Sequence, residues 1–167
     1  MRNKLTLSHN EQSLEHLCPR LFRSKRMIYD PKKRMNMKDY IYKLQMTVRD
    51  YECDVEGIVN NANYLHYMEH TRHQFLLSKG ISFIELHKRG IDAVVARVNM
   101  QYKASLTPDV DFLSCLNVVK EGVKYVFTQD IYRLPDMKLC VRGKVETVTV
   151  VNGKLAESPE MDAMFAE

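Results

Sequence analysis

The chain has 167 residues, of which 45% are hydrophobic and 28% charged, with a formal net charge of +4. This length and composition are those of a single globular domain with a substantial core. There is no apolar run near the roughly 20 residues of a transmembrane helix and no apolar core of a secretory signal. The four cysteines are far apart and form no CxxC motif, which predicts reduced thiols in a cytoplasmic protein without a membrane segment.

The basic charge is concentrated in residues 1–38, which hold ten Lys or Arg against three acidic residues. The remaining residues carry 15 basic and 18 acidic side chains, so the body of the chain is mildly acidic. A basic arm can contact nucleic-acid phosphates, but this one lacks interleaved aromatics and any nucleic-acid-binding motif. We therefore expect no nucleic-acid partner. We expect residues 1–38 to be either a poorly ordered extension or a non-native one, and in the second case translation would start at Met35 or Met37. The domain is expected at 39–155 and a tail at 156–167.

The first regular elements are a strand, a polar loop and one long helix. Apolar and polar residues alternate over 42–48, which predicts a half-buried strand. Residues 50–62 are rich in Asn, Asp and Gly, and Gly57 is expected to allow a close backbone approach or a positive φ. A helix is expected over 64–78, with Asn63 as its N-cap and Gly80 at its C′ position. Its buried face is predicted to consist of Tyr64, Tyr67, Met68, Thr71 and Phe75, widened by Leu65 and Leu76.

The second half of the chain is mainly strand. Ser82 and Glu85 have the spacing of a capping box for a short helix that ends at Gly90. Strands are predicted over 93–102, 111–120, 124–133 and 139–151, with a hairpin turn at Glu121-Gly122. In the first of these strands the predicted common face is Val94, Ala96, Val98 and Met100. Ser158-Pro159 predicts the start of a short terminal helix. A single long helix among these strands predicts an α+β fold with an antiparallel sheet.

Asp54 is the leading candidate for chemistry. It lies one short loop before the N-terminus of the long helix, where unpaired N–H groups and the positive end of the helix dipole would stabilise an oxyanion. A carboxylate beside such a site can attack a carbonyl or deprotonate a water molecule. These components suit acyl transfer to water, whereas the simpler alternative is that Asp54 only caps a turn.

The sequence also resembles a known family. The pattern runs Asp54-Val55-Glu56-Gly57-Ile58-Val59, then Asn63-Tyr64, then Tyr67-Met68-Glu69 and Arg72. It is similar to the signature of the 4-hydroxybenzoyl-CoA thioesterase-like hotdog proteins, and the likeness extends over about 39–155. The resemblance implies a hotdog fold, in which an antiparallel sheet wraps one central helix. It also implies a homodimer or homotetramer with active sites at the subunit junction.

The resemblance assigns roles to individual residues. Asp54 matches the catalytic aspartate, and Asn61 would supply the backbone N–H that polarises the thioester carbonyl. The substrate would be acyl-CoA, or an acyl group on acyl carrier protein, with coenzyme A as part of the substrate and no metal or redox cofactor. We expect the apolar surface of Tyr64, Tyr67 and Met68 to enclose the acyl chain. The further substrate-binding candidates are Gly57, Val59, Asn60 and Glu69.

Two departures from the family pattern concern the carrier. Similar proteins often have His or Tyr where this chain has Asn61. Asparagine keeps the backbone N–H, but any role of the His or Tyr side chain is lost. Related acyl-carrier-protein thioesterases often have His at the position of Ile58, next to a Val-Asn-Asn like residues 59–61. The chain is thus intermediate between subgroups, and an acyl-acyl carrier protein thioesterase and a non-catalytic acyl-binding subunit remain the alternatives.

Other residues are weaker candidates. Glu69 could orient water or pair with Arg72, although a structural role is the more common one for such a residue. His66, His70 and His73 have metal-compatible helical spacing but form no HExxH motif, and a solvated polar face is favoured over zinc binding. Cys53 adjoins Asp54, but no base is evident to activate its thiol.

Overall fold

The structure, a computed structural model, describes residues 40–165, without the side chain of Met164. The predictions for residues 1–38 therefore lie outside the described residues. The strands are β1 (Tyr42–Thr47), β2 (Ile91–Tyr102), β3 (Asp111–Glu121), β4 (Lys124–Arg133), β5 (Lys138–Val151) and β6 (Lys154–Leu155). The helices are α1 (Asn61–Ser78), α2 (Phe83–Lys88) and α3 (Pro159–Met164), with a 3-10 turn, η1, at Asp50–Glu52.

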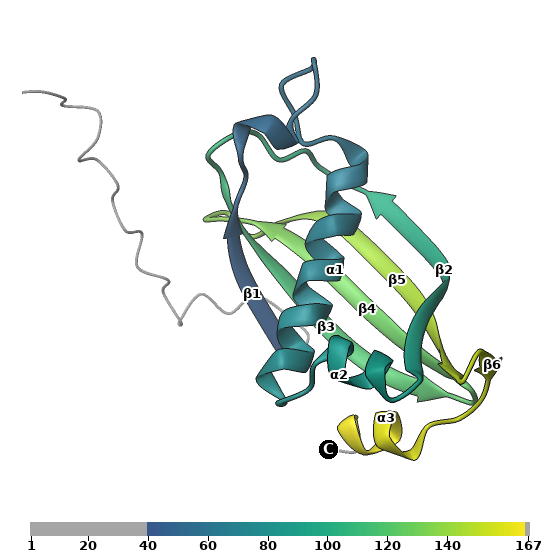
Figure 1. Cartoon of the computed structure of the whole chain (residues 1–167). Coiled ribbons are helices and arrows are strands. Elements are labelled where there is room, and N and C mark those ends of the chain that lie inside the picture. Colours follow the sequence, from purple (N-terminus) through teal and green to yellow (C-terminus); the bar gives the residue numbers. More distant parts are fainter. Residues whose placement is uncertain (1–39, 166–167) are drawn as a thin grey trace, which may run out of the picture. The chain divides into compact units, whose positions relative to one another are not determined.

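The strands form one antiparallel sheet in the order β1-β3-β4-β5-β2, and the short β6 pairs with β5. Helix α1 lies across one face of this sheet, in front of β3, β4 and β5, with β1 and β2 on either side of it (Figure 1). The predicted α+β architecture, with one long helix against an antiparallel sheet, is confirmed. Because β1 and β2 are the end strands, each leaves one edge without a partner among the described strands.

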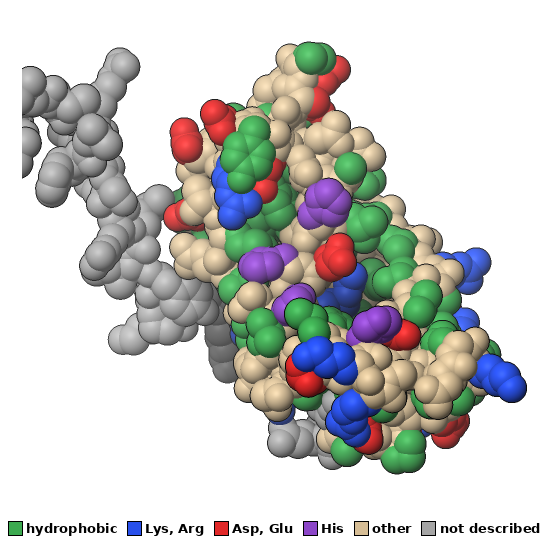
Figure 2. Space-filling model, in the orientation of Figure 1, with side chains coloured by type: hydrophobic (Ala, Val, Ile, Leu, Met, Phe, Trp, Pro, Cys, Tyr) green, Lys and Arg blue, Asp and Glu red, His purple; other side chains and the backbone are tan. Residues whose placement is uncertain are grey.

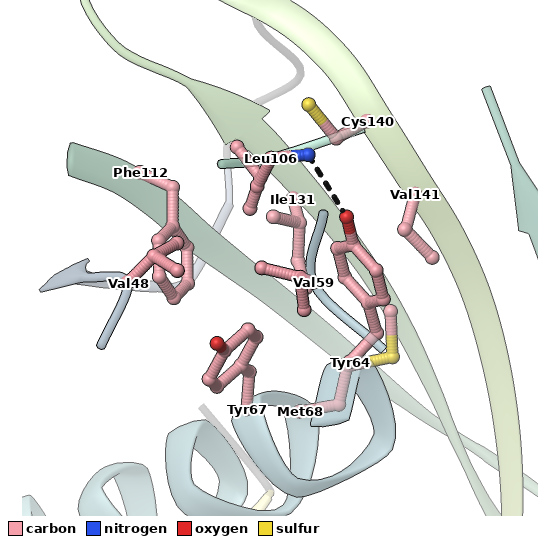
Figure 3. Packing of buried hydrophobic residues seen from close by; sticks show 10 residues of the cluster. All are labelled: Val48, Val59, Tyr64, Tyr67, Met68, Leu106, Phe112, Ile131, Cys140 and Val141. Atoms are coloured by element: carbon pink, nitrogen blue, oxygen red, sulfur yellow. Dashed lines mark hydrogen bonds between the residues drawn. The ribbon is translucent and has the colours of Figure 1, made fainter. Parts of the chain in front are cut away.

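The core forms between α1 and the sheet, where all five residues of the predicted buried face of α1 are buried. Figure 3 shows one end of this core, in which Tyr64, Tyr67 and Met68 point from α1 towards residues of the sheet and its loops. Helix and sheet approach closely at Gly143 of β5, since a Cβ atom there would lie 2.6 Å from the Met68 sulfur. Glycine at this position therefore lets α1 pack directly onto β5.

One predicted strand face is wrong. The sequence placed Val94, Ala96, Val98 and Met100 together, but the register of β2 against β5 shifts between Val95 and Arg97 and leaves Ala96 unpaired. Because a bulge of one residue reverses the alternation, Val94 lies on the opposite face from Val98 and Met100. The face that β2 shares with α1 consists of Ile91, Ala93, Val95, Val98, Met100 and Tyr102.

Several helix ends and turns agree with the sequence. Helix α1 ends before Gly80, which has the positive φ of 76° expected for a C′ residue. The Ser158 hydroxyl accepts a hydrogen bond from the Met161 N–H at the start of α3. Ser82 occupies the N-cap position of α2 as predicted, but the predicted capping box does not form, because the Ser82 side chain makes no cap bond. Within residues 40–165, no helix is long and apolar enough to cross a membrane.

Candidate active site

The loop that carries Asp54 is a small hairpin between η1 and α1. The Asp54 N–H donates to the carbonyl of Ile58 over 2.9 Å, and the Gly57 N–H donates back to the carbonyl of Asp54 over 3.0 Å. Gly57 has φ of 71°, and its Cβ position would meet no atom within 4 Å, so the backbone conformation is what selects glycine here. Val55 at the tip is 98% exposed, and the loop projects beyond the N-terminus of α1 (Figure 1).

The Asp54 carboxylate is held but not enclosed. Its Oδ1 atom accepts a 3.2 Å hydrogen bond from the Glu56 N–H, and the side chain is half-buried. This contact is the Asx-type turn that the simpler alternative predicted. It uses one lone pair of one oxygen, so the carboxylate retains acceptor sites for a water molecule or a substrate.

Helix α1 begins earlier than the sequence predicted, because its N-cap is Asn60 and not Asn63. The Asn60 side chain accepts a hydrogen bond from the Ala62 N–H over 3.0 Å. The Asn63 side chain instead donates to the carbonyl of Glu52 over 2.7 Å, and the Asn60 N–H donates to the same carbonyl over 3.0 Å. Two contacts therefore fix the N-terminus of α1 against the residue that lies two positions before Asp54.

Asn61 is the first residue of α1, and its backbone N–H is a free donor. None of the hydrogen bonds within residues 40–165 uses this N–H, whereas the N–H groups of Ala62 and Asn63 both bond to Asn60. The Asn61 carbonyl accepts a 3.1 Å hydrogen bond from the Tyr102 hydroxyl at the end of β2. Asn61, an exposed residue, thus has one backbone donor without a partner among the described residues, at the positive end of the helix dipole.

Glu52 is a site residue that the sequence reasoning missed. The residue is 7% exposed, and its carboxylate accepts hydrogen bonds from the Arg49 N–H, the Arg49 guanidinium and the Tyr67 hydroxyl, the last over 2.8 Å. Burial and the bond to Glu52 raise the pKa of Tyr67 far above its ordinary value, so this hydroxyl stays protonated and donates. No motif indicated this contact, because a Glu in a polar loop reads as exposed.

Most of the predicted substrate-binding residues lie in the core or stabilise the backbone of the loop and of α1. Tyr64, Tyr67 and Met68 are 3%, 6% and 0% exposed, so they leave almost no surface with which to enclose an acyl chain, and we do not retain them in that role. The Tyr64 hydroxyl accepts a bond from the Leu106 N–H. Val59 is in the core and Asn60 caps α1, while Gly57 shapes the turn.

The remaining candidates lie farther along α1 or beside Asp54. Glu69 is exposed, and Arg72 bonds to Gln129 rather than to Glu69. His66, His70 and His73 are exposed on the side of α1 where Figure 2 shows histidines gathering. In the part of the chain that the structure describes, no three His, Cys, Asp or Glu side chains are arranged to hold a metal ion. Burial, followed by the charge of Asp54, raises the pKa of the Cys53 thiol, which disfavours a thiolate nucleophile.

The fold places this chain in the structural class of hotdog-fold proteins. The structure of a 1,4-dihydroxy-2-naphthoyl-CoA thioesterase from Synechocystis superimposes with a TM-score of 0.72 at 14% identity, covering 75% of this chain and 96% of that one. The structure of a hypothetical protein from Aquifex aeolicus gives 0.70 at 26% identity, covering 74% and 98%. The predicted hotdog fold is thereby confirmed.

The family is shown by sequence as well. The model of the thioesterase-like superfamily matches residues 48–167, and the chain belongs to this family. The acyl-acyl carrier protein thioesterase ATL2 of Arabidopsis thaliana is 31% identical over 114 residues, which are 66% of this chain. The matched segment spans 60% of the length of that relative, so its activity is not transferred directly to this chain.

Proposed function

We propose that the protein hydrolyses acyl-CoA thioesters to a free acid and coenzyme A. The observation that carries the proposal is the half-buried, partly unsatisfied carboxylate of Asp54 in the loop that feeds α1, whose first N–H, that of Asn61, is free. A thioester carbonyl bound at Asn61 would be polarised, and the oxyanion of the tetrahedral intermediate would be stabilised there. Membership of the thioesterase-like superfamily supports this chemistry.

Asp54 has two possible roles in this reaction. As a general base it accepts a proton from water, the hydroxide attacks the carbonyl carbon, and the C–S bond breaks as the thiolate leaves and takes up a proton. As a nucleophile its Oδ atom attacks the carbon, expels the thiolate and forms an anhydride that water then hydrolyses. Both routes consume one water and give one acid and one thiol.

A single turnover in ¹⁸O-labelled water identifies the nucleophilic route if the label enters Asp54, whereas attack of water on the acyl carbonyl of the anhydride would label the product acid as the general-base route does. In the general-base route the label enters the product acid directly. In the nucleophilic route, attack of water on the Asp54 side of the anhydride leaves the label in the enzyme, where mass spectrometry of the peptide with Asp54 detects it. Neither route requires a metal ion or a redox cofactor, and we propose that none takes part.

A second copy of the chain is proposed to complete the site. β2 is an end strand of 12 residues, and three apolar side chains on the face that it shares with α1 are 39% to 50% exposed, namely Val95, Val98 and Tyr102. Figure 2 shows hydrophobic side chains on the surface over β2. A long apolar edge of this kind is suited to pairing with another chain. Because the Tyr102 hydroxyl also contacts Asn61, such a partner would lie next to the thioester site.

The oligomeric state tests this part of the proposal. Analytical ultracentrifugation is expected to find a homodimer or homotetramer. Val98→Lys is expected to shift the protein towards monomer and to abolish hydrolysis. A monomeric wild type with full activity would contradict the proposal that a second copy completes the site. We also propose that the protein acts in the cytoplasm, in keeping with the free thiols of the three described cysteines, Cys53, Cys115 and Cys140.

Acyl carrier protein is the second candidate carrier, and the similarity to ATL2 favours it. The test is a panel of acyl-CoAs of increasing chain length, one aromatic acyl-CoA and matched acyl-acyl carrier proteins, with the released thiol followed by a chromogenic reagent. Release of thiol from the CoA esters is expected. If thiol is released only from the acyl-acyl carrier proteins, these and not the acyl-CoAs are the substrates. If no ester releases thiol, the protein is a non-catalytic acyl-binding subunit.

A further inference from the structure

A cavity of about 120 Å³ lies between the second half of α1, α2, β2 and α3, away from the Asp54 loop. Most of its walls are apolar and include Leu76 of α1, Phe83 of α2, Phe127 of β4, Met161 of α3, and Phe165, which follows α3. Arg72 also lines it, and so does Glu69. Other polar side chains in its walls are those of His73 and Thr147. A largely buried arginine in such a cavity needs a physical reason, because burying a charge without a counterion is unfavourable.

The Arg72 guanidinium is largely removed from water and has a neutral partner. The residue is 8% exposed, its Nη1 atom donates to Gln129 Oε1 over 2.7 Å, and its charge lies 5.8 Å from the centre of the Phe127 ring. Burial lowers the pKa of Arg72, and the charge of Glu69 partly opposes this shift. Arginine nevertheless remains protonated in proteins, so the cavity contains a positive charge.

No carboxylate within residues 40–165 forms an ion pair with Arg72. Glu69, three residues earlier on α1, influences the charge but is exposed and makes no salt bridge with it. A guanidinium has five N–H donors in a planar fork, and the described residues accept from only one of its nitrogens. Arg72 lines the cavity and keeps donors that the described residues do not use, so a carboxylate in the cavity could accept a two-point, charge-assisted contact from it.

The position of Arg72 relative to Asn61 gives the length of a suitable ligand. Eleven residues separate the two, which is three turns of α1, so they lie on the same side of the helix about 16 Å apart along its axis. An extended chain advances about 1.2 Å per covalent bond, so about 10 to 14 carbons connect the two points.

From this geometry we propose that the cavity binds the far end of the acyl chain and that Arg72 recognises a carboxylate there. The preferred substrate is then an ω-carboxyacyl thioester of about 10 to 14 carbons. This inference rests on the proposed thioesterase function and adds the chemical class of the acyl group. Gln129 holds Arg72 in place, because its Nε2 atom also donates to the carbonyl of Met68 over 2.9 Å and fixes the amide between sheet and helix.

The test compares two thioesters that differ only at the far end, the dodecanedioic monothioester of CoA and dodecanoyl-CoA. For the full-chain wild type, kcat/KM is expected to be roughly 10- to 100-fold higher for the dicarboxylic ester, as one charge-assisted contact provides. Arg72→Met is expected to reduce this ratio to about one while dodecanoyl-CoA is still hydrolysed. Lys144→Met removes an exposed positive charge from the opposite face of β5 and is expected to keep the wild-type ratio.

A ratio of one or below in the wild type, or an unchanged ratio in Arg72→Met, overturns the inference. If Arg72→Met does not fold, Arg72→Lys keeps the charge without the planar fork and is expected to lower the ratio; an undiminished ratio there overturns the inference too. If no thioester is hydrolysed, the proposed function fails. Calorimetric titration with dodecanedioate then tests separately whether Arg72 binds a carboxylate. Binding to wild type at least about tenfold tighter than to Arg72→Met supports the site, and equal binding overturns it.

Discussion

The Tyr67 hydroxyl donates a 2.8 Å hydrogen bond to the buried carboxylate of Glu52 and so joins the first half of α1 to the residue two positions before Asp54. The Glu52 carbonyl accepts from the N-terminus of α1 at the same time. The loop and the helix are therefore connected through both the backbone and the side chain of one residue. This connection determines where Asp54 lies relative to the first N–H of the helix.

Tyr67→Phe removes the hydroxyl and leaves the ring in the core. The buried Glu52 carboxylate then loses one of its donors, and the free energy of unfolding is expected to fall by about 1.5–3 kcal/mol. Urea denaturation followed by circular dichroism measures this change. The control is Tyr51→Phe, because Tyr51 is 74% exposed and its change is expected to stay within about 0.5 kcal/mol. Equal effects of the two substitutions would show that the bond to Glu52 adds no stability.

The backbone donor at the start of α1 can be removed selectively. Proline is compatible with the first position of a helix, and Asn60 already has the extended conformation, with φ of −57° and ψ of 138°, that a residue before proline requires. Asn61→Pro is thus expected to fold and to lose about 10²- to 10³-fold in kcat, because it lacks the N–H that holds the oxyanion. Asn61→Ala keeps the N–H and is expected to stay near wild type. Steady-state kinetics that found Asn61→Pro as active as Asn61→Ala would exclude this donor.

Asp162 makes the attachment of α3 sensitive to acid. Its carboxylate accepts hydrogen bonds from Lys120, over 2.7 Å, and from the Tyr125 hydroxyl, and these contacts lower the pKa of Asp162 below its ordinary value. Because the folded-state pKa is the lower one, the stabilisation is complete above the unfolded-state pKa and is lost as the pH falls through the folded-state value. Asp162→Asn is expected to destabilise the protein at pH 7 and progressively less below pH 4. Urea unfolding at a series of pH values checks this, and a pH-independent difference would contradict it.

The parts of the fold that follow from local pattern were predictable from the sequence. The buried face of α1 follows from helical periodicity, and Gly80 and Gly57 both have the positive φ that glycine allows. The bulge at Ala96 was not predictable, because it depends on how β2 registers against β5, to which it is not adjacent in sequence. Two of the four residues predicted for one face of β2, Val94 and Ala96, therefore do not lie on the face of Val98 and Met100.

The candidate site was only partly predictable for similar reasons. Three asparagines stand within four positions, and any of them is a good N-cap by type; the choice of Asn60 depends on Asn63 having a partner in the Glu52 carbonyl. The neutral partner of Arg72 was equally hidden, since Gln129 lies 57 residues away on β4. Contacts between distant segments, which no local pattern contains, account for both misses.

In the proposed reaction the Asp54 carboxylate performs the hydrolysis, and Asp54→Asn is the substitution that removes its charge. Asparagine keeps the side-chain oxygen that accepts from the Glu56 N–H, so the turn persists while the base or nucleophile is lost. On the best ester of the panel, kcat/KM is expected to fall about 10²- to 10⁴-fold at an unchanged melting temperature. Asp109→Asn, an exposed turn residue with φ of 61° that asparagine also adopts, is expected to match wild type. An Asp54→Asn protein as active as Asp109→Asn would contradict this role of Asp54.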